Sequence, residues 1–227
     1  MKHLILENVS LVLVSSVKIN ESLFALNISQ SCIRFKETLF FTSEKINSLS
    51  NAKIIKINKI KNLQDYSIFI LRELFEYINT EYVLVIQHDG FILNPEFWNP
   101  EFLNYDYIGA PWPNKLIISG EYNLTLDVSK NVVGNGGFSL RSKRLLEATS
   151  KFDLDNINFP IIEDLLISYF YYEKLVGLGF KFPTPEMAAS FSVELAESCY
   201  GFGPNTSFGF HGEELKQIIY KSILNEF

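Results

Sequence analysis

The sequence predicts a single α/β domain with a mostly parallel central sheet flanked by helices. Two short apolar, β-branched runs, Val9–Ser15 and Tyr82–Ile86, have the length and the polar boundaries of buried strands. Between Leu63 and Ile78, apolar residues recur at three- and four-residue steps, which is typical of a helix that packs on a sheet. Strands that alternate with helices favour a parallel α/β sheet.

The amino-terminal half supplies most of the predicted sheet. Asp65 lies near the positively polarised amino end of the Leu63–Ile78 helix, where a carboxylate is favourable. That helix leads directly into the strand at Tyr82–Ile86. The predicted elements before it are a strand at Val9–Ser15, a helix at Glu21–Phe35, and strands at Thr38–Thr42 and Lys53–Ile57.

The second half is less regular. Residues 95–113 lack a clear period and predict a long ordered loop, and residues 114–130 fit either a hairpin or a mobile flap. Ser142 is a suitable cap for the helix after it. The further expected elements are a strand at Phe138–Arg141, helices at Lys143–Ser150 and Leu165–Val176, a strand at Ala188–Val193 and a final helix at Glu213–Leu224.

Composition narrows the function. With 227 residues and 47% hydrophobic content, the chain can bury a sizeable core as one domain spanning residues 1–227. The net charge of -6 and the lack of a long basic run argue against nucleic acid as a partner. The one local cluster of lysines forms a solvated face or favours an anionic membrane surface; it consists of Lys53, Lys56, Lys59 and Lys61.

The chain carries no segment that predicts secretion. The apolar run Val9–Val14 is too short to span a membrane and no small-residue cleavage site follows a basic flank, so we expect a cytoplasmic protein. Cys32 and Cys199 fit reduced, structural thiols better than a disulfide framework. The oligomeric state is not predicted by these features.

The most informative motif is Gln87-His88-Asp89-Gly90, directly after the apolar run Tyr82–Ile86. It places a carboxylate at the carboxyl end of a buried strand, where ligands bind in open α/β sheets. The alternative is that Asp89 is an ordinary turn residue or helix cap. Gly90 would permit a sharp exit from the strand.

Four later motifs strengthen the functional interpretation: Tyr105–Trp112, Val133–Arg141, Glu163-Asp164 and Phe210-His211-Gly212. Taken in this order with the first motif, they resemble the metal-dependent GT-A glycosyltransferases. The resemblance is closest to a family labelled as a domain of unknown function, whose members look like nucleotide-sugar transferases. It runs from about Val9 to His211 and implies a GT-A-like, Rossmann-like fold.

The resemblance implies a divalent cation, Mn²⁺ or Mg²⁺, held by Asp89 and His211. Such ions favour carboxylate and phosphate oxygens, and Mn²⁺ tolerates imidazole. GT-A enzymes usually carry an Asp-x-Asp metal motif, and here its first position is Gln87, a neutral group that could hold the donor's ribose or a metal-bound water. The donor expected from the resemblance is a nucleotide sugar, UDP-linked, and the acceptor is a glycan hydroxyl.

The resemblance also implies roles for the other motifs. Asp164 is expected to be the general base of an inverting transfer and Glu163 to orient groups beside it; the alternative is that both merely complement a helix dipole. Trp112 offers an apolar face to the acceptor sugar. The residues expected at the donor are Ser15, Ser16, Gln87, Asp89, Asn135, Gly136, Gly137 and Arg141.

Two other functions compete with this one. The first is a catalytically silent GT-A-like module that binds a glycan or a protein, which Gln87 favours because it replaces an expected metal ligand. The second is a nucleotidyltransferase that makes the activated sugar. That activity would need a Gly-rich, basic amino-terminal loop, and the segment from Val14 to Asn20 lacks one.

Overall fold

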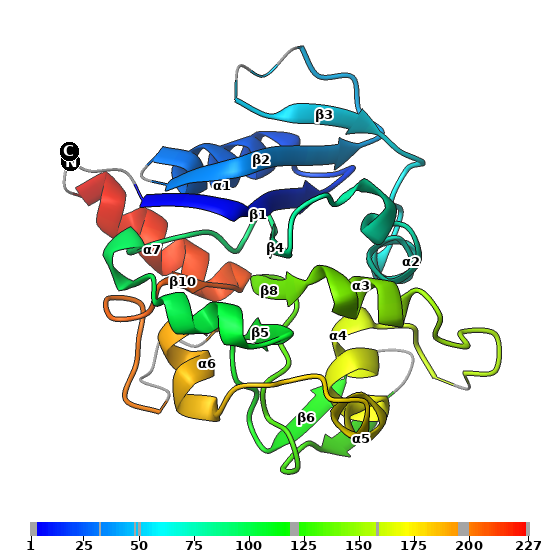
Figure 1. Cartoon of the computed structure of the whole chain (residues 1–227). Coiled ribbons are helices and arrows are strands. Elements are labelled where there is room, and N and C mark those ends of the chain that lie inside the picture. Colours follow the sequence, from blue (N-terminus) through cyan, green and yellow to red (C-terminus); the bar gives the residue numbers. More distant parts are fainter. Residues whose placement is uncertain are drawn as a thin grey trace.

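The computed structural model confirms the α/β class: a six-stranded sheet lies at the centre and helices cover it (Figure 1). It describes residues 4–31, 33–47, 49, 51–118, 123–157, 159–194 and 200–225. Cys32 and Cys199, which we expect to be reduced thiols, lie outside the described residues. None of the helices in these ranges has the length and apolar character needed to cross a membrane.

The elements follow the predicted alternation in the first half of the chain. The strands of the central sheet are β1 (Leu4–Val14), β2 (Ile33–Thr42), β3 (Lys53–Lys56), β4 (Tyr82–Ile86), β5 (Tyr107–Gly109) and β8 (Ser139–Ser142). Two smaller sheets pair β6 (Lys115–Ile118) with β7 (Leu124–Asp127), and β9 (Ser192–Val193) with β10 (Gly209–Phe210).

The helices differ in length and type. The α-helices are α1 (Ile19–Ser31), α2 (Leu63–Arg72), α3 (Lys143–Thr149), α4 (Glu163–Leu165), α5 (Tyr172–Gly177), α6 (Pro185–Phe191) and α7 (Glu213–Asn225). A π-helix at Leu166–Phe170 joins α4 to α5, and single turns of 3₁₀ helix occur at Leu74–Tyr77, Pro95–Phe97 and Pro100–Asn104.

In the strand order, β3-β2-β1-β4-β8-β5, the side of β1 on which successive strands are added changes after β3. The chain moves outward from β1 through β2 to β3, and then returns to form β4 on the other side of β1, with all of these pairs parallel. Strand β8 is antiparallel to β4 and to β5. The carboxyl ends of β1 and β4 therefore flank a topological switch point, the place where open α/β sheets bind ligands.

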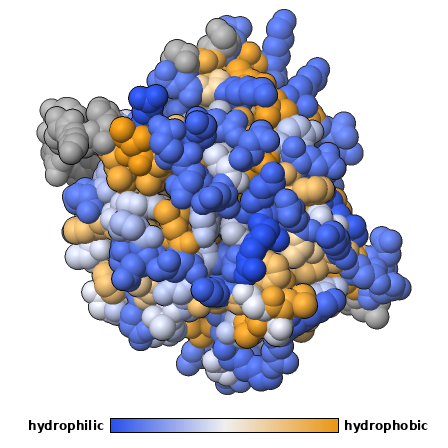
Figure 2. Space-filling view, in the orientation of Figure 1, coloured by the Kyte–Doolittle hydropathy of each residue, from blue (hydrophilic) through white to orange (hydrophobic). Residues whose placement is uncertain are grey.

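Alternate residues of β1 face two separate apolar layers. Leu11 and Leu13 join the layer formed with α1, α6 and α7, whereas Val12 and Val14 join the layer formed with α2 and α3. Side chains on successive strand residues point to opposite faces, so a strand that is buried on both faces must be apolar throughout. On the outer surface, hydrophilic residues separate smaller hydrophobic groups on the face seen in Figure 2.

Several predicted boundaries were wrong; the helix expected at Leu63–Ile78, for example, ends at Arg72 and is followed by a 3₁₀ turn at Leu74–Tyr77. The helix expected at Glu21–Phe35 ends at Ser31, because Ile33 begins a strand in which buried and exposed residues alternate. The strand expected at Ala188–Val193 is mostly helix α6, with only its last two residues in β9. The sequence contained the helix signal: Thr184 caps the first turn by accepting a hydrogen bond from the Met187 amide, and Pro185 follows it.

The irregular middle of the chain is partly regular. Within the segment at 114–130, the described strands β6 and β7 pair antiparallel, as the hairpin alternative predicted. The segment at 95–113, expected to be a loop, contains two 3₁₀ turns and the short strand β5. Ser142 caps α3 as predicted, since its Oγ accepts a hydrogen bond from the Leu145 amide at 3.1 Å.

Candidate functional site

The turn after β4 presents Asp89 at the switch point. Backbone hydrogen bonds in both directions between Gln87 and Gly90 close the turn. A Cβ atom on Gly90 would lie 3.0 Å from both the Phe210 carbonyl oxygen and the His211 ring. Gly90 is therefore needed for close packing. The φ angle of Gly90 is not positive, so the sharp exit from β4 that we expected does not depend on a left-handed backbone.

A small parallel sheet brings His211 to the same turn. Strand β10 pairs with β9 so that Phe210 lies opposite Val193, and the His211 amide donates to the Val193 carbonyl at 2.9 Å. The Gly212 amide donates to the Asp89 carbonyl, also at 2.9 Å. The imidazole lies against Gly137, where any Cβ atom would overlap the ring. His211 is thus held by backbone contacts on several sides.

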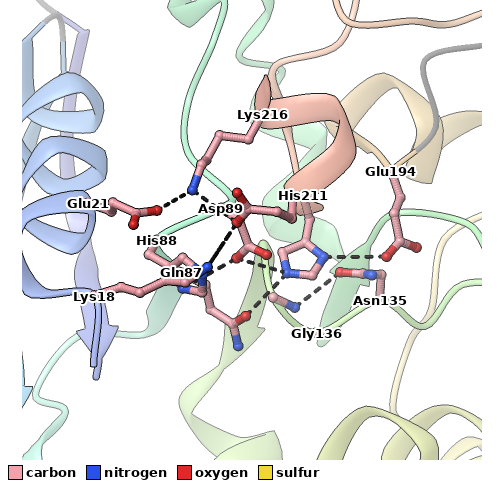
Figure 3. Close-up of polar contacts among 12 residues, drawn as sticks. Lys18, Glu21, Gln87, His88, Asp89, Asn135, Gly136, Glu194, His211 and Lys216 are labelled. Atoms are coloured by element: carbon pink, nitrogen blue, oxygen red, sulfur yellow. Dashed lines mark hydrogen bonds and ion pairs between the residues drawn. The ribbon is translucent and has the colours of Figure 1, made fainter. Parts of the chain in front are cut away.

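Acidic groups surround the His211 imidazole (Figure 3). Its Nε2 lies 3.2 Å from Gln87 Oε1 and 3.6 Å from Asp89 Oδ1, and its Nδ1 lies 3.5 Å from Glu194 Oε1. Burial alone would lower the pKa of His211, but the carboxylates of Glu194, Asp89 and Asp164 outweigh it and raise that pKa above the ordinary value. The surroundings therefore favour a positive charge at this place, which a proton on the ring supplies and which a metal ion would supply after displacing that proton.

The same geometry fits a divalent cation. Asp89 Oδ1 is buried and has no hydrogen-bond partner, and such atoms are uncommon in native proteins. It faces His211 Nε2, while Glu194 lies on the other ring nitrogen. A carboxylate in that position commonly fixes the tautomer of a metal-binding histidine and orients its ring. Two protein ligands suit Mg²⁺ or Mn²⁺, since such ions usually take their remaining oxygens from phosphate and water.

A second cluster of possible ligands lies next to the first. Glu21, His88 and Glu213 each offer an atom within 4.8 Å of the others. Two ammonium groups already occupy these carboxylates, because Lys216 contacts both of them and Lys18 contacts Glu213. A cation there would have to displace like charges, so we favour Asp89 and His211 as the metal ligands.

The acidic pair at the start of α4 divides into a buried member and a partly exposed member. Glu163 is 2% exposed and forms an ion pair with the fully buried Arg141, at 2.6 Å between Oε1 and Nη2. Asp164 accepts hydrogen bonds from the Gly136 amide at 3.1 Å and from the Leu165 amide at 2.8 Å. Of these two carboxylates, only that of Asp164 is partly exposed and so available to a ligand.

The environment of Asp164 favours its neutral form. Burial, and then the neighbouring Glu163 carboxylate, raise the pKa of Asp164 to about 8, although the Gly136 amide and the Arg141 guanidinium oppose this shift. A carboxyl group with a pKa near the working pH can both accept and return a proton, which is the property required of a general base.

The glycine motif connects the two halves of the site. The Asn135 side chain accepts from the Gly137 amide at 3.1 Å and so shapes the turn. A Cβ atom on Gly136 would overlap Glu163, just as one on Gly137 would overlap His211. The close approach predicted for these glycines is therefore found, but toward the acidic pair and the imidazole. A side chain at position 136 would disturb the fold as well as any ligand.

Two other residues that we expected to contact a ligand, Arg141 and Trp112, are buried. Arg141 is fully buried and donates to Ser139 and to the Gly136 carbonyl, so it acts on the site through Glu163. Trp112 is 6% exposed and packs in an apolar cluster with Leu165, so the open ring face that we expected is covered.

Ser15 and Ser16 lie at the carboxyl end of β1 as expected, with both side chains engaged in the loop. Ser15 Oγ donates to the Val17 carbonyl at 2.6 Å. Ser16 Oγ accepts from the Ile60 amide and from Ser43. These bonds fix the loop that follows β1 at the switch point.

The sequence interpretation missed Glu194, which supports His211. A signal was present, because Glu194 directly follows the last residue of a predicted strand, just as the Gln87–Gly90 turn follows β4. Its significance depends on the pairing of β9 with β10, and two-residue strands have no periodicity that a sequence pattern can detect.

Comparison with known families places the chain in one of them. The family described as "Protein of unknown function (DUF5672)" matches residues 49–211, which is well over half of the chain. The chain belongs to this family. The match includes every motif from Gln87 to His211, but it leaves out Ser15 and Ser16 and is shorter than the resemblance from Val9 that we expected. A comparison with curated proteins finds no match.

Among solved structures, the chain is similar to the mannosyltransferase PcManGT from Pyrobaculum calidifontis in complex with GDP-Man and Mn²⁺. The TM-score is 0.49 and the sequence identity 10%, over 78% of this chain and 55% of that one. The chain thus spans about half the length of that protein. A likeness of this strength says nothing about activity or ligands.

The buried ion pair should dominate the stability of this region. We expect Glu163→Ala to lower the free energy of unfolding by about 3–5 kcal/mol, because it leaves the Arg141 charge buried without a partner. Glu173→Ala, which breaks an exposed pair with Lys130, is the matched control and should cost less than about 1 kcal/mol. Urea unfolding measures both, and equal losses would contradict the importance of the buried pair.

The raised pKa of Asp164 predicts a pH-dependent stability. The folded protein retains the proton between pH 4 and 8, whereas the unfolded chain releases it near pH 4. The stability that Asp164 contributes is therefore present below pH 4 and lost as pH rises to about 8. Between pH 5 and pH 9, the melting temperature of the wild type should therefore fall more steeply with pH than that of Asp164→Asn. Parallel profiles would show that the pKa is not raised.

Proposed function

We propose that this protein is a metal-dependent, inverting glycosyltransferase that transfers a sugar from a nucleoside diphosphate to a glycan hydroxyl. The observation that carries the proposal is the convergence of Asp89, His211 and Asp164 at the switch point. Asp89 and His211 offer one carboxylate oxygen and one imidazole nitrogen 3.6 Å apart. Asp164 is joined to them through Gly136 and Gly137.

Asp89 and His211 would hold the cation, with Glu194 orienting the imidazole. A divalent cation in this position supplies neutralisation of the negative charge on the departing diphosphate. Gln87 contributes its amide oxygen to His211 rather than a second carboxylate. Because an amide oxygen only accepts, this contact requires a proton on Nε2, and a cation bound at Nε2 would replace that proton and release Gln87 from the ring.

Asp164 would remove the proton from the acceptor hydroxyl. The hydroxyl oxygen then forms a bond to the anomeric carbon as the bond to the diphosphate oxygen breaks, and the proton remains on Asp164. A pKa of about 8 makes Asp164 a stronger base than an ordinary aspartate, once it is ionised. Glu163 and Arg141 keep its carboxylate in place by fixing the start of α4.

The donor and the acceptor are proposed by class only. UDP-linked sugars follow from the sequence resemblance, and a panel that includes GDP, ADP and CDP derivatives would identify the nucleoside. Trp112 would have to move to offer a ring face to an acceptor, since apolar side chains now cover it. Asn135, Gly136 and Gly137 remain the proposed neighbours of the donor sugar.

Metal dependence is the first expected property. Mn²⁺ should strengthen the binding of a nucleoside diphosphate, and Asp89→Ala should remove most of that gain, because the cation loses its carboxylate ligand. Isothermal titration calorimetry in Mn²⁺ and in chelator measures the difference. Glu21→Gln is the matched control, as it alters the neighbouring acidic cluster and should keep the gain.

Two results would count against this assignment. Equal affinity in Mn²⁺ and in chelator, with the fold intact, would exclude a metal role. Loss of the gain in Glu21→Gln but not in Asp89→Ala would place the cation among Glu21, His88 and Glu213.

Base catalysis is the second expected property. Asp164→Asn should lower the rate of sugar transfer by about 10²-fold or more, while leaving donor affinity nearly unchanged. The wild-type rate should rise with pH through about 8, and this rise should disappear in the variant. Initial rates from pH 6 to 9.5 check both points. Native rates in the variant would refute the role, and no transfer by the wild type with any donor would favour a binding module.

A further inference from the structure

Lys18 lies in the connection between β1 and α1, at one side of the switch point. Its φ is 48°, in the left-handed region that residues other than glycine seldom adopt. Its carbonyl accepts a hydrogen bond from the Ser22 amide at 2.9 Å, which helps to hold this conformation at the start of α1. Backbone conformations of this kind cluster at ligand-binding sites, where the surrounding structure maintains them.

The ammonium group of Lys18 forms an ion pair with Glu213, which also has a second cationic partner. Lys18 Nζ lies 3.2 Å from Glu213 Oε2, and Lys216 Nζ lies 3.0 Å from the same oxygen. The Lys216 side chain is 3% exposed and also contacts Glu21, so its ammonium group stays paired with these two carboxylates. The Lys18 side chain is 45% exposed. Lys18 can therefore exchange its partner while Glu213 stays neutralised by Lys216.

The ammonium group also lies close to the proposed metal ligands (Figure 3). The His88 ring lies between Glu213, the partner of Lys18, and Asp89, a proposed metal ligand. Its Nε2 is 3.7 Å from Glu213 Oε2 and its Nδ1 is 3.7 Å from Asp89 Oδ1. In the view of Figure 3, the Lys18 side chain extends toward His88 and Asp89.

The site is acidic, so binding a negatively charged diphosphate there requires an accessible positive charge. The carboxylates of Asp89 and Glu194 would repel a diphosphate, and a single divalent ion offsets only part of the combined negative charge. Arg141 is fully buried beside Glu163 and cannot contribute to a ligand contact. A flexible, exposed ammonium group is well suited to bind phosphate as a point charge.

We propose that Lys18 binds the phosphate oxygens of the nucleoside diphosphate, leaving Glu213 when the donor enters. This inference rests on the proposed function and adds to it a donor-binding residue at β1. It makes Lys18 a phosphate contact in its own right, separate from the metal site.

The test compares Lys18→Asn, Lys18→Arg and the wild type in saturating Mn²⁺. Asparagine tolerates the left-handed backbone and removes the charge, whereas arginine keeps the charge. Affinities for UDP and GDP are measured by calorimetry, and affinity for Mn²⁺ alone by electron paramagnetic resonance. Lys36→Asn is the matched control, because Lys36 forms an exposed pair with Glu7 at 3.5 Å.

The proposal predicts that Lys18→Asn binds the tighter of the two diphosphates about tenfold more weakly or worse, with unchanged Mn²⁺ affinity. Lys18→Arg and Lys36→Asn should stay close to the wild type. Wild-type affinity in Lys18→Asn, an equal loss in Lys18→Arg, or a parallel loss of Mn²⁺ affinity would each overturn the inference. If the wild type binds neither UDP nor GDP, both the proposed function and the inference about Lys18 fail.

Discussion

The buried ion pair between Arg141 and Glu163 is the constraint on which the rest of the site depends. Two charges taken out of water are tolerated only with good geometry and further hydrogen bonds, so β8 and the start of α4 must meet in one arrangement. That arrangement fixes the Gly136 carbonyl, which accepts from Arg141, and places Asp164 where it accepts from the Gly136 amide. The same pair therefore fixes the position of the proposed base, while burial does most to raise the pKa of Asp164, with Glu163 adding to that shift and Arg141 opposing it.

The site combines a rigid sheet edge with contacts from distant parts of the chain. Asp89 depends on β4, which is buried on both faces, whereas His211 reaches it through the two-residue strands β9 and β10. Gln87 and His211 are 124 residues apart in sequence and in contact through their side chains. Glycines at 90 and 137 make this possible, because any side chain there would crowd the imidazole.

Much of the fold, but only part of the site, could be predicted from the sequence. The apolar run at Tyr82–Ile86 has a pattern that tertiary contacts do not change, so β4 and the position of Asp89 follow from it. Local periodicity could not show that Arg141 and Trp112 are buried, because burial is decided by which strands and helices meet. Glu194 was missed for the same reason, and the resemblance rather than spacing suggested His211.

The position of the cation tests the proposed site most directly. Crystals grown with Mn²⁺ and a nucleoside diphosphate, measured at a wavelength where manganese scatters anomalously, would locate it. We expect one anomalous peak about 2.1 Å from a carboxylate oxygen of Asp89 and from His211 Nε2, with phosphate oxygens completing the coordination. A peak among Glu21, His88 and Glu213 instead, or a diphosphate bound without any peak, would contradict it.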